Sequence, residues 1–227
     1  MGVDIGNKAL KDAYIGNKPI KKIYLGNKLL WQRLPYEAEI EYLEGSGTQY
    51  IDTEFIPNYN TRLECEYLVK GSNTHNAVLG CADSTNASDA KNGVVILNLL
   101  ASNGTPTRYG FGNGSGTMFQ SDAYSQLNTE YKVYFDKNNV YINDTLVKTL
   151  PTSEWTANNP LRLFGRAPWN TYLLVGYIKY CKIWDGETLV RDYIPVRVGQ
   201  VGSMYDKISG QLFGNSGTGN FILGNDI

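Results

Sequence analysis

The stretch that decides the fold class reads Tyr131-Lys-Val-Tyr-Phe135, Lys137-Asn-Asn139, Val140-Tyr-Ile142, Asn143-Asp144 and Thr145-Leu-Val-Lys-Thr149. Three short runs alternate apolar and polar side chains, and the two gaps between them hold residues typical of tight turns. Alternation with a period of two gives a strand one apolar and one polar face. The stretch therefore predicts a three-stranded meander.

A second hairpin is predicted further along the chain. The run from Tyr172 to Trp184 leads into Asp185-Gly186, a pair that favours a two-residue turn, and then into Thr188 to Ile194. From Glu37 onward such runs recur about every 8 to 12 residues, as in all-β sandwiches. We expect polar loops at 71–76, 83–92, 102–106, 112–128 and 152–160.

Composition supports an all-β fold and excludes several functions. The 227 residues include 24 Gly, 17 Tyr and 22 Asn, and charged residues make up 19%, which argues against helix bundles and coiled coils. The net charge of −1 gives no basic footprint for nucleic acid. The longest apolar run, residues 93–100, is shorter than a membrane helix of about 20 residues. Because no signal peptide is visible, we expect synthesis in a cytoplasm, with neither nucleic acid nor membrane as a partner.

The three cysteines do not indicate disulfides or zinc. Cys65, Cys81 and Cys181 are an odd number, are widely spaced and form no CxxC pair. Cys65 shares a predicted strand face with Leu63 and Tyr67. We therefore expect reduced, buried thiols.

A ten-residue repeat occupies the N-terminus. Ile5-Gly-Asn-Lys8 recurs as Ile15-Gly-Asn-Lys18 and as Leu25-Gly-Asn-Lys28. Gly-Asn suits the centre of a two-residue hairpin turn, so the repeat predicts a small β-meander with three turns. So short a segment has too little apolar surface for its own core and should need a partner surface.

The charge of the chain divides at the end of this repeat. Residues 1–31 hold six Lys and two Asp and carry +4, which leaves −5 for the remainder. Since Pro35 follows the last apolar run, we place the domains at 1–35 and 36–227. The basic arm is either a solvated face or a module for attachment to an acidic neighbour. In the second case the attachment residues are Lys8, Lys18, Tyr24, Lys28 and Trp31.

Two segments of the second domain carry a family resemblance. Tyr42-Leu-Glu-Gly-Ser-Gly-Thr-Gln-Tyr-Ile-Asp-Thr53 and Tyr205-Asp-Lys-Ile-Ser-Gly-Gln-Leu-Phe-Gly-Asn-Ser-Gly-Thr-Gly-Asn-Phe221 resemble the opening and closing strands of LamG-like, concanavalin-like jelly-roll domains. The hairpin at 177–195 is similar to the family's hairpin near the C-terminus. The resemblance covers residues 36–227 and implies a jelly-roll β-sandwich. It is specific for fold rather than function, because the family has binding, structural and catalytic members.

The front repeat carries a second resemblance. Ile23-Tyr-Leu-Gly-Asn-Lys-Leu-Leu-Trp31 resembles short modules that precede variable domains in phage tail and structural proteins. The two resemblances together imply a bacteriophage virion protein, such as a tail, fibre or capsid-decoration component, assembled in the bacterial host cytoplasm. Its N-terminal module would bind other virion proteins. Virion fibres are often trimeric and a meander without a core favours strand exchange, so we expect a homo-oligomer and specifically a trimer.

Aromatic residues on polar loops give the candidate ligand site. A sugar ring stacks its C–H face on Trp or Tyr, while Asn, Asp and Arg bind its hydroxyls. Two loop segments have that mixture, and their candidate residues are Trp155, Arg166, Trp169, Asn170 and Tyr172. The alternative is that these aromatics pack to close one end of the sandwich.

The family resemblance also implies a loop calcium, since LamG-like domains often carry one. Asp83, Asn86 and Asp89 offer hard oxygen ligands, although their spacing matches no EF-hand. No other cofactor is indicated.

Catalysis has two sequence candidates. Glu39-Ile-Glu-Tyr-Leu-Glu44 resembles the E-x-D-x-x-E strand of laminarinase-like glycosidases, but Glu41 replaces the middle Asp. Glu39 and Glu41 share one strand face, whereas Glu44 lies on the other unless a bulge intervenes. His75, the sole histidine, lies in a turn-like stretch without an obvious Asp partner. We therefore expect a solvated strand face and no enzyme.

Three functions follow, in order of preference. The first is a phage adhesion protein that binds carbohydrate or another ligand on the host surface through its jelly roll. The second is an architectural tail or capsid decoration without a ligand. The third is a glycosidase of the concanavalin-like fold.

Overall fold

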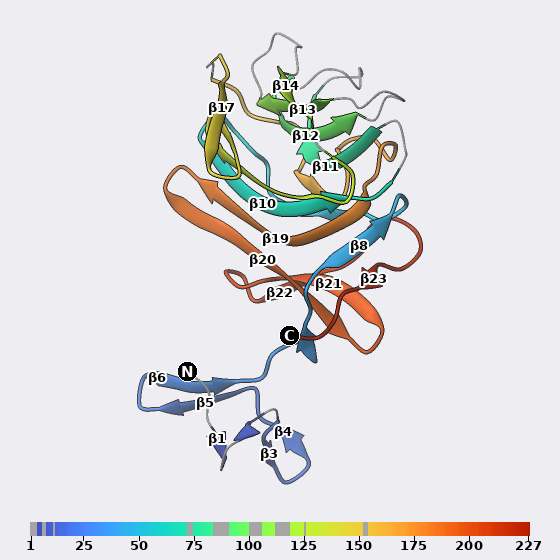
Figure 1. Ribbon diagram of the computed structural model, residues 1–227. Coiled ribbons are helices and arrows are strands. Elements are labelled where there is room, and N and C mark those ends of the chain that lie inside the picture. The colour runs from blue at the N-terminus through green and yellow to red at the C-terminus, as the bar shows by residue number, and fades with distance from the viewer. Residues whose placement is uncertain are drawn as a thin grey trace. The chain divides into compact units, whose positions relative to one another are not determined.

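The computed structural model describes residues 4–5, 8–10, 12–71, 75–83, 91–99, 106–111, 119–124, 126–151 and 154–227. The regular elements within them are all strands, which confirms the all-β prediction (Figure 1). No helix in these ranges has the length and apolarity needed to cross a membrane. The chain divides into two compact units, Met1–Glu37 and Ala38–Ile227, two residues beyond the boundary placed from the sequence.

The N-terminal unit consists of three two-stranded sheets. β1 (Asp4–Ile5) pairs with β2 (Lys8–Ala9), β3 (Tyr14–Ile15) pairs with β4 (Lys18–Pro19), and β5 (Lys22–Leu25) pairs with β6 (Lys28–Gln32). Gly16 and Gly26 have φ of 59° and 58°, as glycine adopts at the first central position of a hairpin turn.

The tight Gly-Asn turns are therefore confirmed in the second and third repeats. The continuous meander is not formed, because the described strands pair only within their own hairpins. Strands of two residues, one of which ends in Pro19 without an N–H, offer few groups to a further strand.

The second unit consists of two sheets, in which hairpins of consecutive strands are joined through strands that are distant in sequence (Figure 1). The main path of the larger sheet is β17 (Thr145–Thr149), β16 (Asn139–Ile142), β15 (Glu130–Asp136), β10 (Thr61–Val69), β19 (Val175–Asp185), β20 (Thr188–Val198), β21 (Val201–Asp206) and β22 (Gln211–Phe213). β7 (Ala38–Glu39) pairs with β20, while β8 (Leu43–Ser46) pairs with β19 and with β23 (Ile222–Leu223). The smaller sheet is β14 (Phe119–Tyr124), β13 (Pro106–Phe111), β12 (Val94–Leu99), β11 (His75–Cys81), β18 (Arg162–Leu163) and β9 (Ile51–Asp52).

The strands read from residues 131–149 and from the Asp185-Gly186 hairpin are confirmed as β15–β17 and β19–β20. Three expected loops are wrong in part, because His75 begins β11, Pro106 begins β13 and β14 lies inside the stretch 112–128. Pairing with a neighbouring strand decides these cases, and for His75 the partner is Leu99 of β12.

Buried side chains of both sheets form one large core. All three cysteines belong to it and are free thiols, as expected. Cys65 and Cys181 lie directly opposite each other on β10 and β19. Burial raises the pKa of the Cys65 thiol well above its usual value and that of Cys81 to about 12, so both stay protonated.

The two segments that resemble the jelly-roll family contact each other. Gln49, 2% exposed, accepts the Ser46 N–H and donates to the Asn220 carbonyl. A Cβ at Gly217 would lie 2.2 Å from the Thr48 carbonyl oxygen, closer than real Cβ contacts. Glycine at 217 is therefore required by space, and these contacts join the start of the sandwich to its end.

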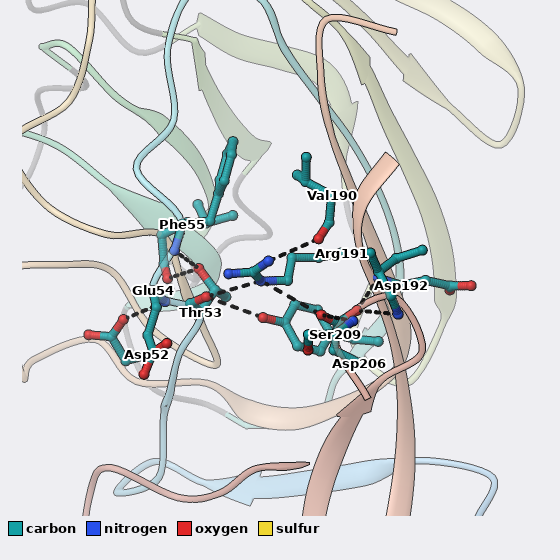
Figure 2. Close-up of polar contacts among 12 residues, drawn as sticks. Asp52, Thr53, Glu54, Phe55, Val190, Arg191, Asp192, Asp206 and Ser209 are labelled. Carbon is teal, nitrogen blue, oxygen red and sulfur yellow. Dashed lines mark hydrogen bonds and ion pairs between the residues drawn. The ribbon is translucent and has the colours of Figure 1, made fainter. Parts of the chain in front are cut away.

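A buried carboxylate fixes the last hairpin of the larger sheet (Figure 2). Asp206 is fully buried and accepts the backbone N–H groups of Asp192, Ile208 and Ser209 at 2.8–3.2 Å. Arg191 Nε lies 3.9 Å from Asp206 Oδ2 and donates at 3.4 Å to the carbonyl of Thr53. The network thus ties the end of β9 to β20 and β21.

Candidate functional site

The loop formed by residues 164–174 lies along β11 of the smaller sheet. Ala167 donates its N–H to Gly80 and accepts one from Ala82, while the Ala77 N–H donates to the Tyr172 carbonyl. These backbone bonds hold the loop at both ends. Four of the five predicted ligand residues therefore lie on one fixed segment.

Arg166 and Trp169 face each other within this loop. Their backbones form an antiparallel bridge, and the guanidinium carbon of Arg166 lies 4.5 Å from the centre of the Trp169 ring. Arg166 is only 2% exposed. The prediction that Arg166 contacts ligand is therefore wrong, because its side chain is buried and stacked on Trp169. It is a positioning residue for the half-buried indole.

Arg162 of β18, which is not among the predicted site residues, holds the other side of the loop. Its Nη1 donates to the Trp169 carbonyl at 3.1 Å and to Asn170 Oδ1 at 3.0 Å. Its guanidinium also lies 4.2 Å from the centre of the Tyr50 ring. The sequence does contain a signal for this position. Arg162 lies between Leu161 and Leu163, and the alternation of a strand directs its side chain away from the core.

The accessible part of this cluster has mixed chemistry. Asn170 and Tyr172 are exposed, while Trp169 and Tyr50 are half-buried. The amide of Asn170 donates two N–H groups even while its oxygen accepts from Arg162. An indole ring, an amide and a phenol on one loop can together contact the C–H face and the hydroxyls of a sugar.

Trp155 lies apart from this loop, and its prediction as a ligand residue is wrong. The side chain is 6% exposed and belongs to the core. Its carbonyl accepts the Tyr59 N–H. For Trp155, the alternative of a packed aromatic is therefore the correct one.

Asp83 of the expected calcium site accepts hydrogen bonds from two asparagines. Its Oδ1 accepts the Asn158 N–H at 2.8 Å, and its Oδ2 accepts Asn158 Nδ2 at 2.7 Å and Asn92 Nδ2 at 3.2 Å. Asn86 and Asp89 lie outside the described residues. Among the described residues, no group of three or more His, Cys, Asp or Glu could hold a metal. The carboxylate of Asp83 orients the loop at Asn158, and the calcium stays a prediction.

The proposed attachment residues fall into two groups. Lys18, Tyr24 and Lys28 are exposed, with Tyr24 at 53%. Trp31 is 7% exposed, and its indole N–H donates to the Leu10 carbonyl. Its assignment to a partner contact is wrong, because the ring is buried within the chain. The side chain of Lys8 lies outside the described residues.

The glutamates of the glycosidase-like pattern are separated by their contacts. Glu41 Oε2 accepts Asn225 Nδ2 at 3.0 Å, whereas Glu44 Oε2 pairs with Lys70 Nζ at 2.6 Å. Glu39 lies on β7 and Glu44 on β8, so the pattern does not follow one regular strand. The side chain of His75 is outside the described residues.

A solved structure similar to this chain shares its architecture. A proposed carbohydrate-binding protein from Bacteroides ovatus ATCC 8483 matches with a TM-score of 0.52 and 12% identity, covering 87% of this chain and 63% of that one. The fold is a concanavalin-like jelly roll. The heptameric SAP-like pentraxin from Limulus polyphemus matches with a TM-score of 0.48 and 11% identity, covering 84% of this chain and 96% of that one.

At these identities the likeness shows fold alone, and this chain spans only 63% of the length of the Bacteroides protein. No protein-family model matches the chain, and no curated protein is significantly similar to it. The jelly-roll prediction is confirmed. The phage origin stays a prediction, since it rests on the sequence resemblance.

Proposed function

We propose that the jelly roll binds carbohydrate through the loop that carries Trp169. The observation that carries this proposal is the fixed arrangement of one indole, one exposed amide and one exposed phenol, from Trp169, Asn170 and Tyr172. Stacking on Trp169 would supply most of the affinity, and the polar side chains would select the sugar. The similar fold of a proposed carbohydrate-binding protein supports the ligand class.

The second part of the proposal concerns the N-terminal unit. It serves as an attachment module in a larger assembly, which the sequence resemblance implies is a phage virion assembled in the host cytoplasm. The exposed side chains of Lys18, Tyr24 and Lys28 support this role, as does the charge of +4 over residues 1–31. Unsatisfied apolar surface on the hairpins favours a homo-oligomer, and we propose a trimer.

Binding without catalysis is the third part. Glu41 and Glu44 are held by Asn225 and Lys70, an arrangement that suits structural contacts. A glycosidase of this fold would need both carboxylates directed at one bond.

A glycan array prepared from host cell surfaces tests the first part. The full-length chain should bind a subset of the array, and Trp169→Ala should weaken that binding about tenfold or more. Tyr59→Ala is a suitable control, because Tyr59 is 40% exposed and lies outside the loop. Wild-type affinity in Trp169→Ala would contradict the assignment of the loop.

The architectural alternative is favoured by one observation. The guanidinium groups of Arg162 and Arg166 both contact Trp169 within the loop. Such contacts stabilise the loop itself and do not require a ligand. In that case the array shows no binding at all, while particles assembled with Trp169→Ala remain complete and infectious.

A further inference from the structure

The outer face of the larger sheet carries a row of aromatic side chains. Phe135 and Ile183 are fully buried in the core, so alternation directs their neighbours Tyr134 and Trp184 to the opposite face. Tyr141 of β16 lies directly opposite Tyr134 of β15. All three aromatic side chains are half-buried, which leaves part of each ring accessible.

The spacing of these rings suits a chain of sugars. The ring centres of Tyr134 and Tyr141 are 5.8 Å apart, and those of Tyr134 and Trp184 are 6.4 Å apart. Both distances are comparable to the spacing of successive hexose units in a glycan. The ring planes differ by 37° and 83°, so the surface is twisted and fits a soluble, turning chain better than a flat crystalline one.

Two other tyrosines on the same face, Tyr177 and Tyr180, have a structural role, because each forms a hydrogen bond within the protein. Tyr177 Oη donates to Glu130 at 2.6 Å, and Tyr180 Oη donates to Glu64 at 2.8 Å. Tyr42 stacks on Tyr177, with ring centres 4.4 Å apart. These polar groups are already engaged within the protein.

The row of Tyr134, Tyr141 and Trp184 differs in this respect. Within the described part of the chain, neither the two phenol groups nor the indole N–H makes a hydrogen bond. Three hydrogen-bond donors therefore lie beside a cluster of aromatic rings that pack on one another, and none of these donors holds the sheet together. This combination is what a ligand with both C–H faces and hydroxyls requires.

Charges next to the row define the ligand further. Arg62 Nε lies 2.7 Å from Asp136 Oδ1, and Arg62 Nη1 lies 2.7 Å from Glu187 Oε2. One cation thus stands between two carboxylates, which disfavours a polyanion and offers acceptors for hydroxyl groups.

We propose that Tyr134, Tyr141 and Trp184 form a second binding surface, which takes a neutral, soluble glycan chain that crosses β16, β15, β10 and β19. The surface shares its ligand class with the loop of Trp169 but uses none of the loop's residues. It would give the chain two contacts with one polysaccharide and so a gain in avidity.

The test uses isothermal titration calorimetry of the full-length protein with cellohexaose, laminarihexaose, xylohexaose and mannohexaose. The loop is first inactivated by Trp169→Ala. In that background, at least one hexaose should still bind, and adding Trp184→Ala or Tyr134→Ala should weaken it about tenfold. Tyr134→Phe should weaken binding less than Tyr134→Ala, since it keeps the ring. Tyr42→Ala is the matched control on the same sheet face and should stay within about twofold.

The outcomes separate the two sites. Loss of all binding in Trp169→Ala alone would overturn this proposal and leave the loop site standing. Unchanged affinity in Trp169→Ala, with weaker binding in Trp184→Ala, would support this surface and reject the loop. Binding of no hexaose by any variant would overturn the surface. The thermal midpoint of each variant must lie well above the temperature of the titration, so that a loss reports on binding rather than folding.

Discussion

The two units of the chain hold their hairpins in different ways. In the sandwich, strands distant in sequence bury a continuous core in which Leu63, Phe135 and Ile183 are fully inaccessible. In the N-terminal unit, Trp31 is the one buried hydrophobic side chain among the described residues. Large apolar side chains that are 44–75% exposed there are Tyr14, Ile15, Tyr24, Leu25, Leu29 and Leu34.

Hairpin formation and core burial are therefore separate requirements in this chain. Turn residues such as Gly16 and Gly26 specify the N-terminal hairpins without a core, because a two-residue turn fixes the register of its strands. Several exposed apolar side chains in one unit are typical of interaction surfaces, in agreement with the attachment role proposed for this unit. Substitutions in the sandwich should therefore act on global stability, and those in the repeat should act locally.

The largest expected effect separates two tryptophans of the sandwich. Trp155→Ala removes a core side chain and should lower the free energy of unfolding by about 3–5 kcal/mol. Trp169→Ala changes a half-buried loop side chain and should lower it by about 1 kcal/mol or less. Urea denaturation followed by circular dichroism measures both. Equal losses of stability in the two variants would contradict the assignment of Trp155 to the core and of Trp169 to the surface loop.

The buried carboxylate of Asp206 should give the next largest effect. Asp206→Ala leaves the N–H groups of Asp192, Ile208 and Ser209 without their acceptor, and we expect a loss of about 3 kcal/mol. Glu154→Ala is the control, because the Glu154 side chain is exposed. That control should change stability by about 0.5 kcal/mol or less. If Asp206→Ala lowers the free energy of unfolding by less than about 1 kcal/mol, water replaces the carboxylate as the acceptor of these N–H groups.

Two glycines test the comparison between the units directly. Gly217→Ala places a methyl group against the Thr48 carbonyl and should cost the sandwich about 1–3 kcal/mol. Gly26 has free space around it but a φ of 58°, so Gly26→Ala should cost about 1–2 kcal/mol, in its own hairpin alone. Hydrogen exchange of peptides spanning 22–32 should accelerate in Gly26→Ala while the urea midpoint of the sandwich stays unchanged. A lower midpoint in that variant would show that the two units unfold together.

Elements of this fold are predictable from the sequence where their signal lies within one short segment. The hairpins at 131–149 and around Asp185-Gly186 were predictable, since alternation and turn residues lie within one short segment. β14 was not, because Phe119-Gln-Ser-Asp-Ala-Tyr124 has little alternation and is a strand through its pairing with β13.

The residues of the candidate site were predictable from the sequence, but which of their side chains are buried was not. Sequence identified the loop of Trp169, Asn170 and Tyr172, since aromatic and amide residues cluster there. It could not tell that Trp155 and Arg166 turn inward, because that depends on contacts with segments far along the chain, such as Tyr59 and β11. The outer row of Tyr134, Tyr141 and Trp184 was equally hidden, as its members come from three strands that only the sheet order brings together.

The smallest expected effect concerns acid stability and the ion pairs on the outer sheet face. Lys179 Nζ lies 2.6 Å from Glu130 Oε1, and hydrogen bonds from Lys179 and Tyr177 lower the pKa of the Glu130 carboxyl. A carboxyl whose pKa is lower in the folded state stabilises the fold above its unfolded pKa of about 4.3, and that stability is lost as the pH falls through the folded value.

Glu130→Gln should therefore lower the free energy of unfolding at pH 7 by less than about 1 kcal/mol, since the Glu130 side chain is 43% exposed. The difference from the wild type should shrink as the pH falls below about 4, where both chains carry a neutral group at this position. Urea titrations at several pH values measure it, with exposed Glu154→Gln as the control that should show no such convergence. A gap that stays constant with pH would assign the effect to lost packing of the Glu130 side chain rather than to its charge.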